Sequence, residues 1–592
     1  EVQPGIFVYD MGQNMVGVPE ITLHGMEAGR EINLRYAEVK YPDLPRYAGN
    51  EGMIMLENIR AAMAQDKYIT KGGEETIAPR FTYHGYRYVE ITGIDKALPL
   101  ESVKGTVLSS IDGLASQYET SNKKVNRLWH NIVWSTYANF FSIPTDCPQR
   151  NERLGWAGDI SVFSRTATYL ADVPQFLRRY LQAMRDVQRE HGRFPDVAPL
   201  GVGFGGLLWG SAGITVPWEV YQQYGDKSLL AEHYVAMGRY IDYILAKTIN
   251  PETGILEQEK VWGNLGDWLG PEDNKNDKTL MWEAYFLYDL DIMVKVSKLL
   301  GKESEARRYA DLYQKRKDFF LRTYVDKVTA QTVSSGADGP EKGKPVDIQT
   351  SYVLPLAFGL VPPELREEFA ARLSQTVQRE NVGDDGKTYP AYSLMTGFIG
   401  TAWISKALSD NGYDDVVYKL LQQTTYPSWL YSVEQGATTI WERLNSYTHL
   451  DGFGENNRMN SFNHYSFGAV GAWMYAYSLG IMRDENHPGF KHFVLSPRVD
   501  PTGQMTFARG YYDSLYGRIE SAWEVKDGEV RYSFTVPANT SATLYLPAAS
   551  ADKVTEDGRV LQAGKNGVKK VMTQEGMLQI ELGSGTYHFV VK

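Results

Sequence analysis

The hydrophobic period of the sequence changes twice along the chain, and this change restricts the fold more than any other feature. Between about residues 119 and 480, apolar residues recur three and four positions apart, as on the buried face of a helix. Twelve segments follow this pattern: residues 122–141, 157–171, 175–191, 211–224, 229–248, 278–300, 303–321, 349–358, 363–377, 397–409, 413–424 and 464–480. Six inner and six outer helices would make an (α/α)6 barrel. Periodicity alone does not exclude a helical solenoid, although no short repeat of that kind is visible.

Short alternating segments, bounded by turn residues, lie before and after the helical region. The segments are residues 6–10, 18–23, 32–36, 67–70, 80–83, 87–91 and 102–109 before it, and 492–496, 517–523, 530–536, 541–546 and 586–591 after it. A chain of 592 residues is also too long for a single core. We therefore predict an antiparallel β-sandwich at residues 1–112, a helical domain, for which the helix count fits the barrel, at 113–485, and a second antiparallel β-sandwich at 486–592.

Composition excludes several classes of partner and site. The net charge of -11, with no basic stripe, argues against nucleic acid, which requires dense Lys and Arg. The single cysteine, Cys147, excludes an internal disulfide and a cysteine-based zinc site. No run of about 18 apolar residues is present, so no membrane span is expected. The sequence begins at Glu1 without Met or a signal peptide, and the compartment and oligomeric state stay open.

Charged and aromatic side chains are densest between Asp146 and Asp159. The stretch holds three carboxylates, two arginines and a tryptophan: Asp146, Glu152, Asp159, Arg150, Arg153 and Trp156. Proline and glycine residues interrupt any long helix there, and aromatic apolar segments lie on both sides. We expect this loop at the mouth of a packed helical layer, where a site for a polar substrate would be built. The alternative is a solvated surface loop with local ion pairs.

A second loop, residues 435–443, offers a partner carboxylate. Hydrolysis of a glycosidic bond needs one carboxylic acid to protonate the leaving oxygen and a second carboxylate to activate water or attack the sugar. Glu442 stands between Trp441 and Arg443. We expect Arg443 to hold Glu442 ionised, whereas an acid near Trp156 would be shifted toward its protonated form by desolvation. A purely structural ion pair is the alternative for Glu442.

Together, residues 146–159 and 438–443 closely resemble glycoside hydrolase family 78, the inverting α-L-rhamnosidases. Residues 9–17, 79–88, 266–269 and 462–468 look like further blocks of the same family, in family order. The resemblance implies an (α/α)6 barrel between two β-sandwiches. It also implies that Glu152 is the general acid, that Glu442 is the general base, and that Asp146 and Asp159 hold sugar hydroxyls.

The resemblance implies cleavage of a terminal, non-reducing α-L-rhamnosyl residue from a glycan or glycoside, with inversion. The two carboxyl groups are then expected ~6.5 to 9.5 Å apart, whereas a spacing near ~5 Å would indicate retention. No cofactor or metal is required, and no Asp-rich loop demands a calcium ion. The aglycone stays open.

Further residues are expected to bind or position the sugar. They are Arg150 beside the carboxylates, Trp156, Trp209, Trp268 and Trp441 as apolar walls, Asp267 beside Trp268, and His464 as a hydroxyl ligand. For each tryptophan, core packing is the alternative. Cys147 is expected to be a packed residue rather than a nucleophile. His84, in the β region, is expected to be structural.

Two positions depart from the family pattern. Asn151 stands where many members carry Asp, and Ser211 follows Trp-Gly where the residue is often acidic. Each change removes a negative charge near the predicted site, but both glutamates remain. The rival functions are another enzyme on the same barrel, such as a lyase or a phosphorylase, and a sugar-binding protein without activity.

Overall fold

The structure is a computed structural model that describes residues 1–203, 206–258, 265–454, 456–574 and 576–591. These residues form two compact units, each assembled from segments that are far apart in the sequence. Unit 1 comprises Glu1–Asp112, Arg127–Gly155 and Trp429–Phe467; unit 2 comprises Gly113–Asn126, Trp156–Ser428 and Gly468–Lys592. The three-domain division of the sequence stays a prediction.

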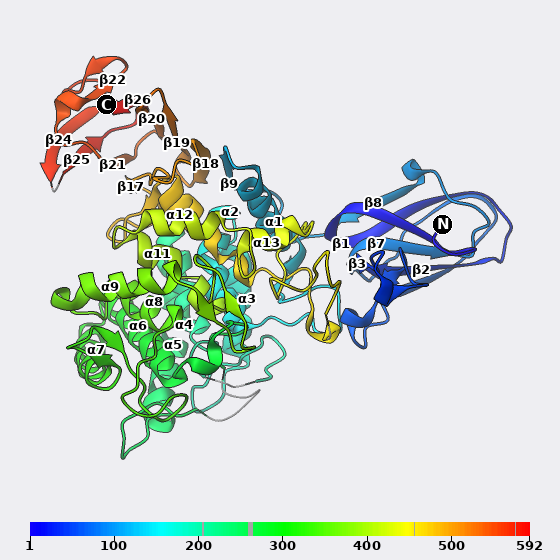
Figure 1. Ribbon diagram of the computed structural model, residues 1–592, viewed down its shortest axis with the longest axis horizontal. Coiled ribbons are helices and arrows are strands. Elements are labelled where there is room, and N and C mark those ends of the chain that lie inside the picture. The colour runs from blue at the N-terminus through cyan, green and yellow to red at the C-terminus, as the bar shows by residue number, and fades with distance from the viewer. Residues whose placement is uncertain (204–205, 259–264, 455, 575, 592) are drawn as a thin grey trace. The chain divides into compact units, whose positions relative to one another are not determined.

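The main sheet of unit 1 has the strand order β5-β2-β7-β1-β6, and β8 also pairs with β1 (Figure 1). Its strands are β1 (Phe7–Met26), β2 (Glu31–Ala37), β5 (Gln65–Ile69), β6 (Gly73–Ile77), β7 (His84–Thr92) and β8 (Val103–Val107). All pairings are antiparallel, and alternate side chains such as Ile32, Leu34, Val89 and Ile91 form a core.

Strand β1 differs from the prediction because it joins two expected strands. Its register against β7 shifts between Asp10 and Met15, which marks a bulge. A bulge bends a strand and redirects its side chains. The first half of β1 pairs with β7, and the second half pairs with β6 and β8. The predicted strand at residues 80–83 is wrong: it is irregular, and Phe81 is fully exposed with a φ of 60°.

The remaining elements of unit 1 come from three parts of the chain. They include β3 (Val39–Lys40), η1 (Pro45–Tyr47), β4 (Ile54–Met55), η2 (Glu57–Ile59), η3 (Leu100–Ser102), β10 (Phe140–Phe141), β11 (Ile143–Pro144), α13 (Trp429–Glu434), η5 (Asn457–Met459) and most of α1 (Lys123–Asn139). β3 pairs with β4, and η2 packs against η5. Segments from the first and last thirds of the chain therefore meet in unit 1.

The long helices of unit 2 confirm the predicted helical class. They are α2 (Ala157–Leu170), α3 (Pro174–Asp186), α4 (Ala212–Tyr224), α5 (Lys227–Lys247), α6 (Lys278–Leu299), α7 (Glu303–Thr323), α8 (Gln349–Ala357), α9 (Pro363–Gln378) and α12 (Asp414–Gln422). Consecutive helices pack as hairpins, as α6 with α7 and α8 with α9 (Figure 1). No helix among the described residues is both long and apolar enough to cross a membrane.

Two predicted helices have a different form. The segment 397–409 is split into α10 (Phe398–Thr401) and α11 (Ile404–Ser409). The segment 464–480 contains η6 (Ser466–Val470), α14 (Gly471–Trp473) and a π-helical turn, η7 (Met474–Ser478). Helix α13 was not predicted. Short or irregular turns carry a weak periodic signal, so tertiary contacts decide them.

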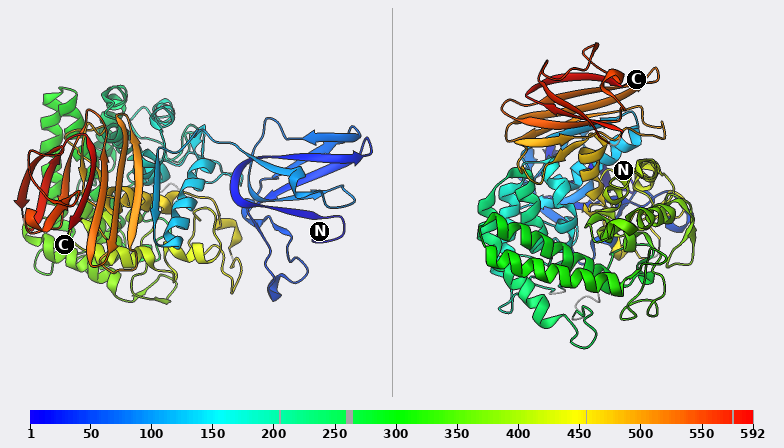
Figure 2. Two further views of the ribbon diagram at one scale, coloured as in Figure 1. Left: turned by 90° about the horizontal axis from the view of Figure 1, so that it is seen from above. Right: turned by 90° about the vertical axis from the view of Figure 1, so that its left-hand side faces the viewer.

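Two sheets of unit 2 form the C-terminal β region (Figure 2). One has the order β16-β17-β21-β25-β24 and the other β23-β22-β26-β20-β19-β18-β9. Their strands are β9 (Ser116–Thr120), β16 (Ile481–Arg483), β17 (His492–Leu495), β18 (Phe507–Ser514), β19 (Gly517–Lys526), β20 (Glu529–Val536), β21 (Ser541–Leu546), β22 (Val554–Glu556), β23 (Arg559–Val560), β24 (Val568–Gln574), β25 (Met577–Leu582) and β26 (Gly585–Val591). β17 and β21 are parallel, an exception to the antiparallel prediction. β9, which precedes the helices, completes the second sheet.

Candidate active site

The loop that begins at Asp146 is closed by its own hydrogen bonds. The Asp146 amide donates to the Leu154 carbonyl at 2.9 Å, and the Leu154 amide donates to Asp146 Oδ1 at 3.0 Å. Arg153 has a φ of 49°, and its guanidinium lies 4.4 Å from the centre of the Tyr83 ring. These contacts fix both ends of a tight loop that carries Arg150 and Glu152.

The Arg150 guanidinium lies at the centre of the carboxylate cluster. Its side chain is 1% exposed, with Nε 2.9 Å from Glu152 Oε2 and Nη2 3.0 Å from Glu442 Oε2. Asp146 Oδ2 is 3.9 Å from Nη2. Burial alone would lower the pKa of Arg150, but Cys147 and the surrounding carboxylates raise it, so the guanidinium stays charged. The buried Arg150 cation thus contacts a carboxylate 292 positions away in the sequence.

The two glutamates predicted as catalytic therefore lie close together. Nη2 of Arg150 is 2.9 Å from Glu152 Oε2 and 3.0 Å from Glu442 Oε2, so these oxygens are no more than about 6 Å apart. This limit concerns one oxygen of each group, whereas the ~6.5 to 9.5 Å range for inverting enzymes concerns the whole carboxyl groups. The stereochemical outcome stays a prediction.

Glu442 is paired differently from the prediction. Its ion-pair partner is Arg150 rather than the neighbouring Arg443, because the loop fold brings a residue distant in sequence to its carboxylate. Burial raises the pKa of Glu442; Arg150 opposes this rise and Glu152 adds to it. The sequence had led us to expect a carboxyl held ionised by an arginine, and burial outweighs that effect here. A raised pKa makes the carboxylate a stronger base.

His464 is held beside the same arginine. Its amide donates to the Ile440 carbonyl at 2.8 Å, and the Glu442 amide donates to the Ser461 carbonyl at 2.9 Å, so segments 440–442 and 461–464 run together. Burial, and then the charge of Arg150, lower the pKa of His464 well below its usual value. The imidazole is therefore neutral at ordinary pH and suits hydrogen bonding to a sugar hydroxyl.

Cys147 is buried inside the cluster. Its Sγ donates to Asp146 Oδ2 at 2.7 Å and accepts from Arg150 Nε at 3.0 Å. Burial raises the pKa of the Cys147 thiol well above its usual value, so it is not an activated nucleophile. Asp146, Cys147 and Glu152 could together coordinate a metal ion. However, the Arg150 guanidinium already supplies the positive charge at this position.

One nitrogen of Arg150 is unpaired among the described residues. Its Nη1 is buried and has no hydrogen-bond partner among the residues that the structure describes. A buried donor without a partner costs free energy in the folded state, of the order of 1–3 kcal/mol. Such a donor is expected where a bound ligand supplies the missing acceptor.

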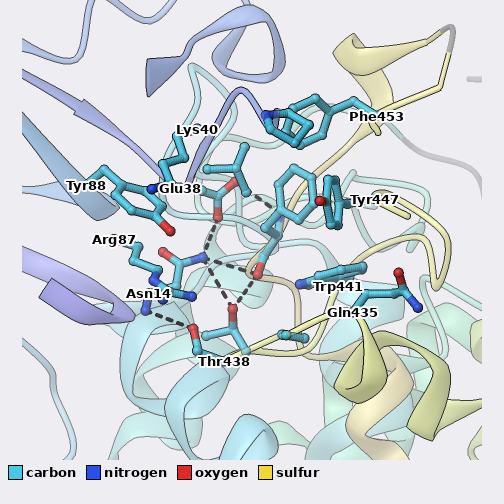
Figure 3. Close-up of a pocket in the computed structure, with 16 residues that line it drawn as sticks. Asn14, Glu38, Lys40, Arg87, Tyr88, Gln435, Thr438, Trp441, Tyr447 and Phe453 are labelled. Carbon is cyan, nitrogen blue, oxygen red and sulfur yellow. Dashed lines mark hydrogen bonds between the residues drawn. The ribbon is translucent and has the colours of Figure 1, made fainter. Parts of the chain in front are cut away.

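Residues of the N-terminal sheet anchor the segment that carries Glu442. Asn14, at the bulge of β1, donates through Nδ2 to Glu38 Oε1 at 2.9 Å, to Thr439 Oγ1 at 3.3 Å and to the Phe462 carbonyl at 3.2 Å (Figure 3). Glu38 Oε2 accepts from the Phe462 amide at 3.1 Å and from Asn58 Nδ2 at 2.9 Å. None of these anchors was predicted. Asn14 lies in one of the resembling blocks, but its role needed the structure.

Glu38 is expected to make stability depend on pH. Burial raises its pKa from 4.5 to about 7, against the hydrogen bonds of Asn14 and Phe462. A carboxyl whose pKa is higher in the folded state than in the unfolded state makes its full contribution to stability below the unfolded-state pKa. This contribution is lost as the pH rises from 4.5 toward about 7. From pH 4 to 8, wild type should therefore lose about 3 kcal/mol relative to Glu38→Gln. Urea unfolding of both proteins across this range measures it, and a constant difference would contradict it.

Trp441 packs into an aromatic cluster on this side of the site. Its ring centre is 5.2 Å from that of Phe462 in an edge-to-face contact, and both rings are buried. Trp441, Tyr447 and Phe453 line a cavity of about 180 Å³ that Glu38 also borders (Figure 3). Core packing, the alternative to sugar binding for Trp441, therefore accounts for part of the contacts of this side chain. Its role as a wall for the sugar stays a prediction.

The other predicted sugar-binding residues belong to unit 2, and their roles stay predictions. Trp156 precedes α2, and Asp159 lies in the first turn of that helix, where the dipole favours a negative charge. The Trp209 ring packs directly on Gly158, so closely that no Cβ would fit. Trp268 follows Asp267 and is partly exposed.

The Asp267 carboxylate accepts hydrogen bonds from other residues of the protein. It is buried and accepts from Thr350 Oγ1, from the Gly397 amide at 2.8 Å and from the Gly400 amide at 2.9 Å. Burial raises its pKa to about 6. These bonds hold the start of α10, which leaves the predicted sugar-binding role without support from the structure.

Ser211, one of the two departures from the family pattern, faces a buried carboxyl. Its Oγ donates to Asp289 Oδ2 of α6 at 2.7 Å. Burial raises the pKa of Asp289 well above its usual value. A serine at position 211 avoids a second carboxyl beside Asp289.

Family models match nearly the whole chain. The bacterial alpha-L-rhamnosidase 6 hairpin glycosidase domain matches residues 114–478. The concanavalin-like domain and the C-terminal domain of the same family match residues 1–109 and 480–561. Six helical hairpins correspond to the (α/α)6 barrel that was predicted, and the predicted β regions lie on both sides of it in the sequence.

Individual relatives give the same result. The chain is 38% identical to an alpha-L-rhamnosidase of Streptomyces avermitilis and 34% identical to one of Formosa agariphila. The alignments cover 100% and 99% of this chain but 52% and 60% of those proteins, so the chain spans little more than half of their length.

Solved structures share the fold. The Streptomyces avermitilis alpha-L-rhamnosidase complexed with L-rhamnose superposes with a TM-score of 0.87 at 37% identity, over 100% of this chain and 52% of that one. The alpha-L-rhamnosidase from Dictyoglumus thermophilum superposes with a TM-score of 0.85 at 33% identity, over 100% and 62%. The chain belongs to the bacterial α-L-rhamnosidase family, glycoside hydrolase family 78.

Proposed function

We propose that this protein hydrolyses terminal α-L-rhamnosides, with Glu152 as general acid and Glu442 as general base. The observation that carries the proposal is the pairing of both glutamates with one buried arginine, although they are 290 residues apart in the chain. Two carboxyl groups held close to one another are what acid and base catalysis of glycoside cleavage requires. The relatives described as alpha-L-rhamnosidases indicate the sugar.

The environments of the two glutamates support this division of roles. The Glu442 side chain is 6% exposed, whereas that of Glu152 is 16% exposed. The acid must reach the leaving group, which departs toward solvent, so the more exposed carboxyl suits it. The base acts on a water at the opposite face of the sugar, inside the pocket. Burial raises the pKa of Glu442, which strengthens it as a base.

The reaction balances with these two groups alone. Glu152 gives its proton to the glycosidic oxygen as the bond to the anomeric carbon breaks. Glu442 takes a proton from the water that attacks the opposite face of that carbon. Glu152 ends ionised and Glu442 protonated, and exchange with solvent restores both. Arg150 keeps both groups in place and stabilises whichever one carries the negative charge.

Asp146 and Arg150 also suit recognition of the sugar. A carboxylate accepts charge-assisted hydrogen bonds from vicinal hydroxyls, and Asp146 is already oriented by the Leu154 amide. Arg150 Nη1 is a buried donor whose partner a sugar oxygen would supply. The partner is thus expected to be a rhamnose-containing glycan or glycoside.

The test is turnover of 4-nitrophenyl α-L-rhamnoside compared with the α-L-fucoside and β-D-glucoside. Wild type should cleave the rhamnoside selectively, and Glu152→Gln should be slower by about 10²-fold to 10⁴-fold, with the larger losses on unactivated rhamnosides. Glu74→Gln, an exposed carboxylate of β6, is the matched control and should be unchanged. An unsaturated product or a sugar phosphate would indicate a lyase or a phosphorylase instead. Binding without turnover would indicate a sugar-binding protein.

A further inference from the structure

Arg60 stands at a backbone position that disfavours its own residue type. It follows the short helix η2 and has φ 59° and ψ -116°. Positive φ is costly for residues with a Cβ, and glycine adopts it freely. Such residues persist where the surrounding structure or the function holds them. The contacts of the Arg60 side chain are therefore expected to explain this backbone conformation.

That side chain ends on the proposed general acid. Arg60 Nη1 lies 2.9 Å from Glu152 Oε2, and Arg60 Nε donates to the Arg458 carbonyl at 2.9 Å. Arg150 Nε contacts the same oxygen of Glu152 at 2.9 Å. Two guanidinium groups, one from the N-terminal segment and one from the site loop, therefore hold a single carboxylate oxygen. Fixing that oxygen fixes the plane of the carboxyl group.

We infer that Arg60 is a positioning residue for Glu152 that sets the direction in which this acid presents its proton. This inference rests on the proposed function. An oxygen that accepts from two guanidinium groups cannot also carry the proton, so in the acid form of Glu152 the proton is on the other oxygen, Oε1. Arg60 thus makes the N-terminal β region a working part of the active site, in addition to the anchoring by Asn14 and Glu38.

Arg60 should also affect the pH dependence of the reaction. Besides contacting Glu152, its positive charge opposes the rise in the pKa of Glu442 that burial causes. Other charged or titratable groups face Glu152 as well, and all of them remain when Arg60 is replaced. These groups are Arg150, Cys147, Asp146 and Glu442. The change caused by Arg60 is therefore read as a difference between variant and wild type.

The test compares Arg60→Gln with wild type on a series of aryl α-L-rhamnosides from 4-nitrophenyl to 4-methoxyphenyl. A good leaving group needs little help from an acid, whereas a poor one depends on it. We expect kcat/KM to fall less than about threefold for the nitrophenyl substrate and about tenfold or more for the methoxyphenyl substrate. The acidic limb of the kcat/KM profile, where Glu442 must lose its proton, should move up when Arg60 is replaced, because loss of the Arg60 charge raises the pKa of Glu442 further.

Two further variants separate positioning from folding. Arg46→Gln is the matched control: Arg46 also reaches from the N-terminal segment to backbone carbonyls, those of Asp451 and Gly454, and contacts no carboxylate in the described residues. It should leave the substrate series unchanged. Arg60→Lys keeps the charge and should recover most of the loss on poor leaving groups. Thermal unfolding of each variant identifies any that is misfolded.

The outcomes are distinct. Equal losses on all substrates with an unmoved pH profile would overturn the inference, because a merely structural arginine affects every substrate alike. Wild type without rhamnoside turnover would refute the proposed function instead. In that case a double-mutant cycle of Arg60→Gln and Glu152→Gln on unfolding stability still tests the pair, and additive effects would overturn it.

Discussion

Replacing Glu442 by Gln is expected to lower kcat/KM on α-L-rhamnosides by about 10³-fold while the protein stays folded. The amide has the shape of the carboxyl group but cannot accept a proton from water, so the attacking nucleophile is no longer activated. The fold should tolerate the change, because burial already raises the pKa of Glu442 and thus disfavours its charge. Steady-state kinetics and thermal unfolding measure the two effects.

A control for Glu442→Gln is available at the neighbouring arginine. Arg443→Gln removes the charge that the sequence placed beside Glu442, whereas the structure pairs Glu442 with Arg150. We expect Arg443→Gln to lower kcat/KM far less than Glu442→Gln does. Comparable losses of kcat/KM in the two variants would support the pairing of Glu442 with Arg443 that was predicted from the sequence.

Replacing Arg150 by Met is expected to cost about 3–5 kcal/mol of unfolding free energy at neutral pH, as well as activity. The change leaves Glu442, Glu152 and Asp146 near one another without their buried counter-ion. Burial raises the pKa of Glu442 even beside Arg150, and removing the cation raises it further. Carboxyls with raised folded pKa values are tolerated when protonated, so the loss should shrink as pH falls toward 4.

Urea unfolding of Arg150→Met at pH 4 and pH 7 measures this dependence. The double variant Arg150→Met with Glu442→Gln should recover part of the lost unfolding free energy at pH 7, because it removes one of the carboxylates left without a counter-ion. A stability loss that does not change with pH, or a double variant no more stable than Arg150→Met, would show that Arg150 acts by packing alone.

The helices were predictable because their signal is local. A buried stripe at a period of 3.6 residues marks α6 and α7 almost to their observed ends. The segment 464–480 was located correctly, but its 3-10 and π turns were not predicted. Likewise, alternation predicted both halves of β1, but their fusion across a bulge depends on pairing with β7.

The site shows where local patterns stop being informative. The resemblance to family 78 assigned Glu152 and Glu442. The local sequence predicted Arg443 as the partner of Glu442, because a sequence pattern can indicate only neighbouring residues. The actual partner, Arg150, comes from another loop. Arg60, Asn14 and Glu38 act across some 90 to 450 positions of sequence, so no spacing rule could assign them.

Glu152 and Glu442 are proposed to act as an acid and base pair that cleaves rhamnosides with inversion. Proton NMR of the first sugar released from an aryl α-L-rhamnoside, recorded before mutarotation, tests this most directly. We expect β-L-rhamnose to appear first and the α anomer to grow in later. Initial release of α-L-rhamnose would mean retention and would contradict the assignment of Glu442 as a base that activates water.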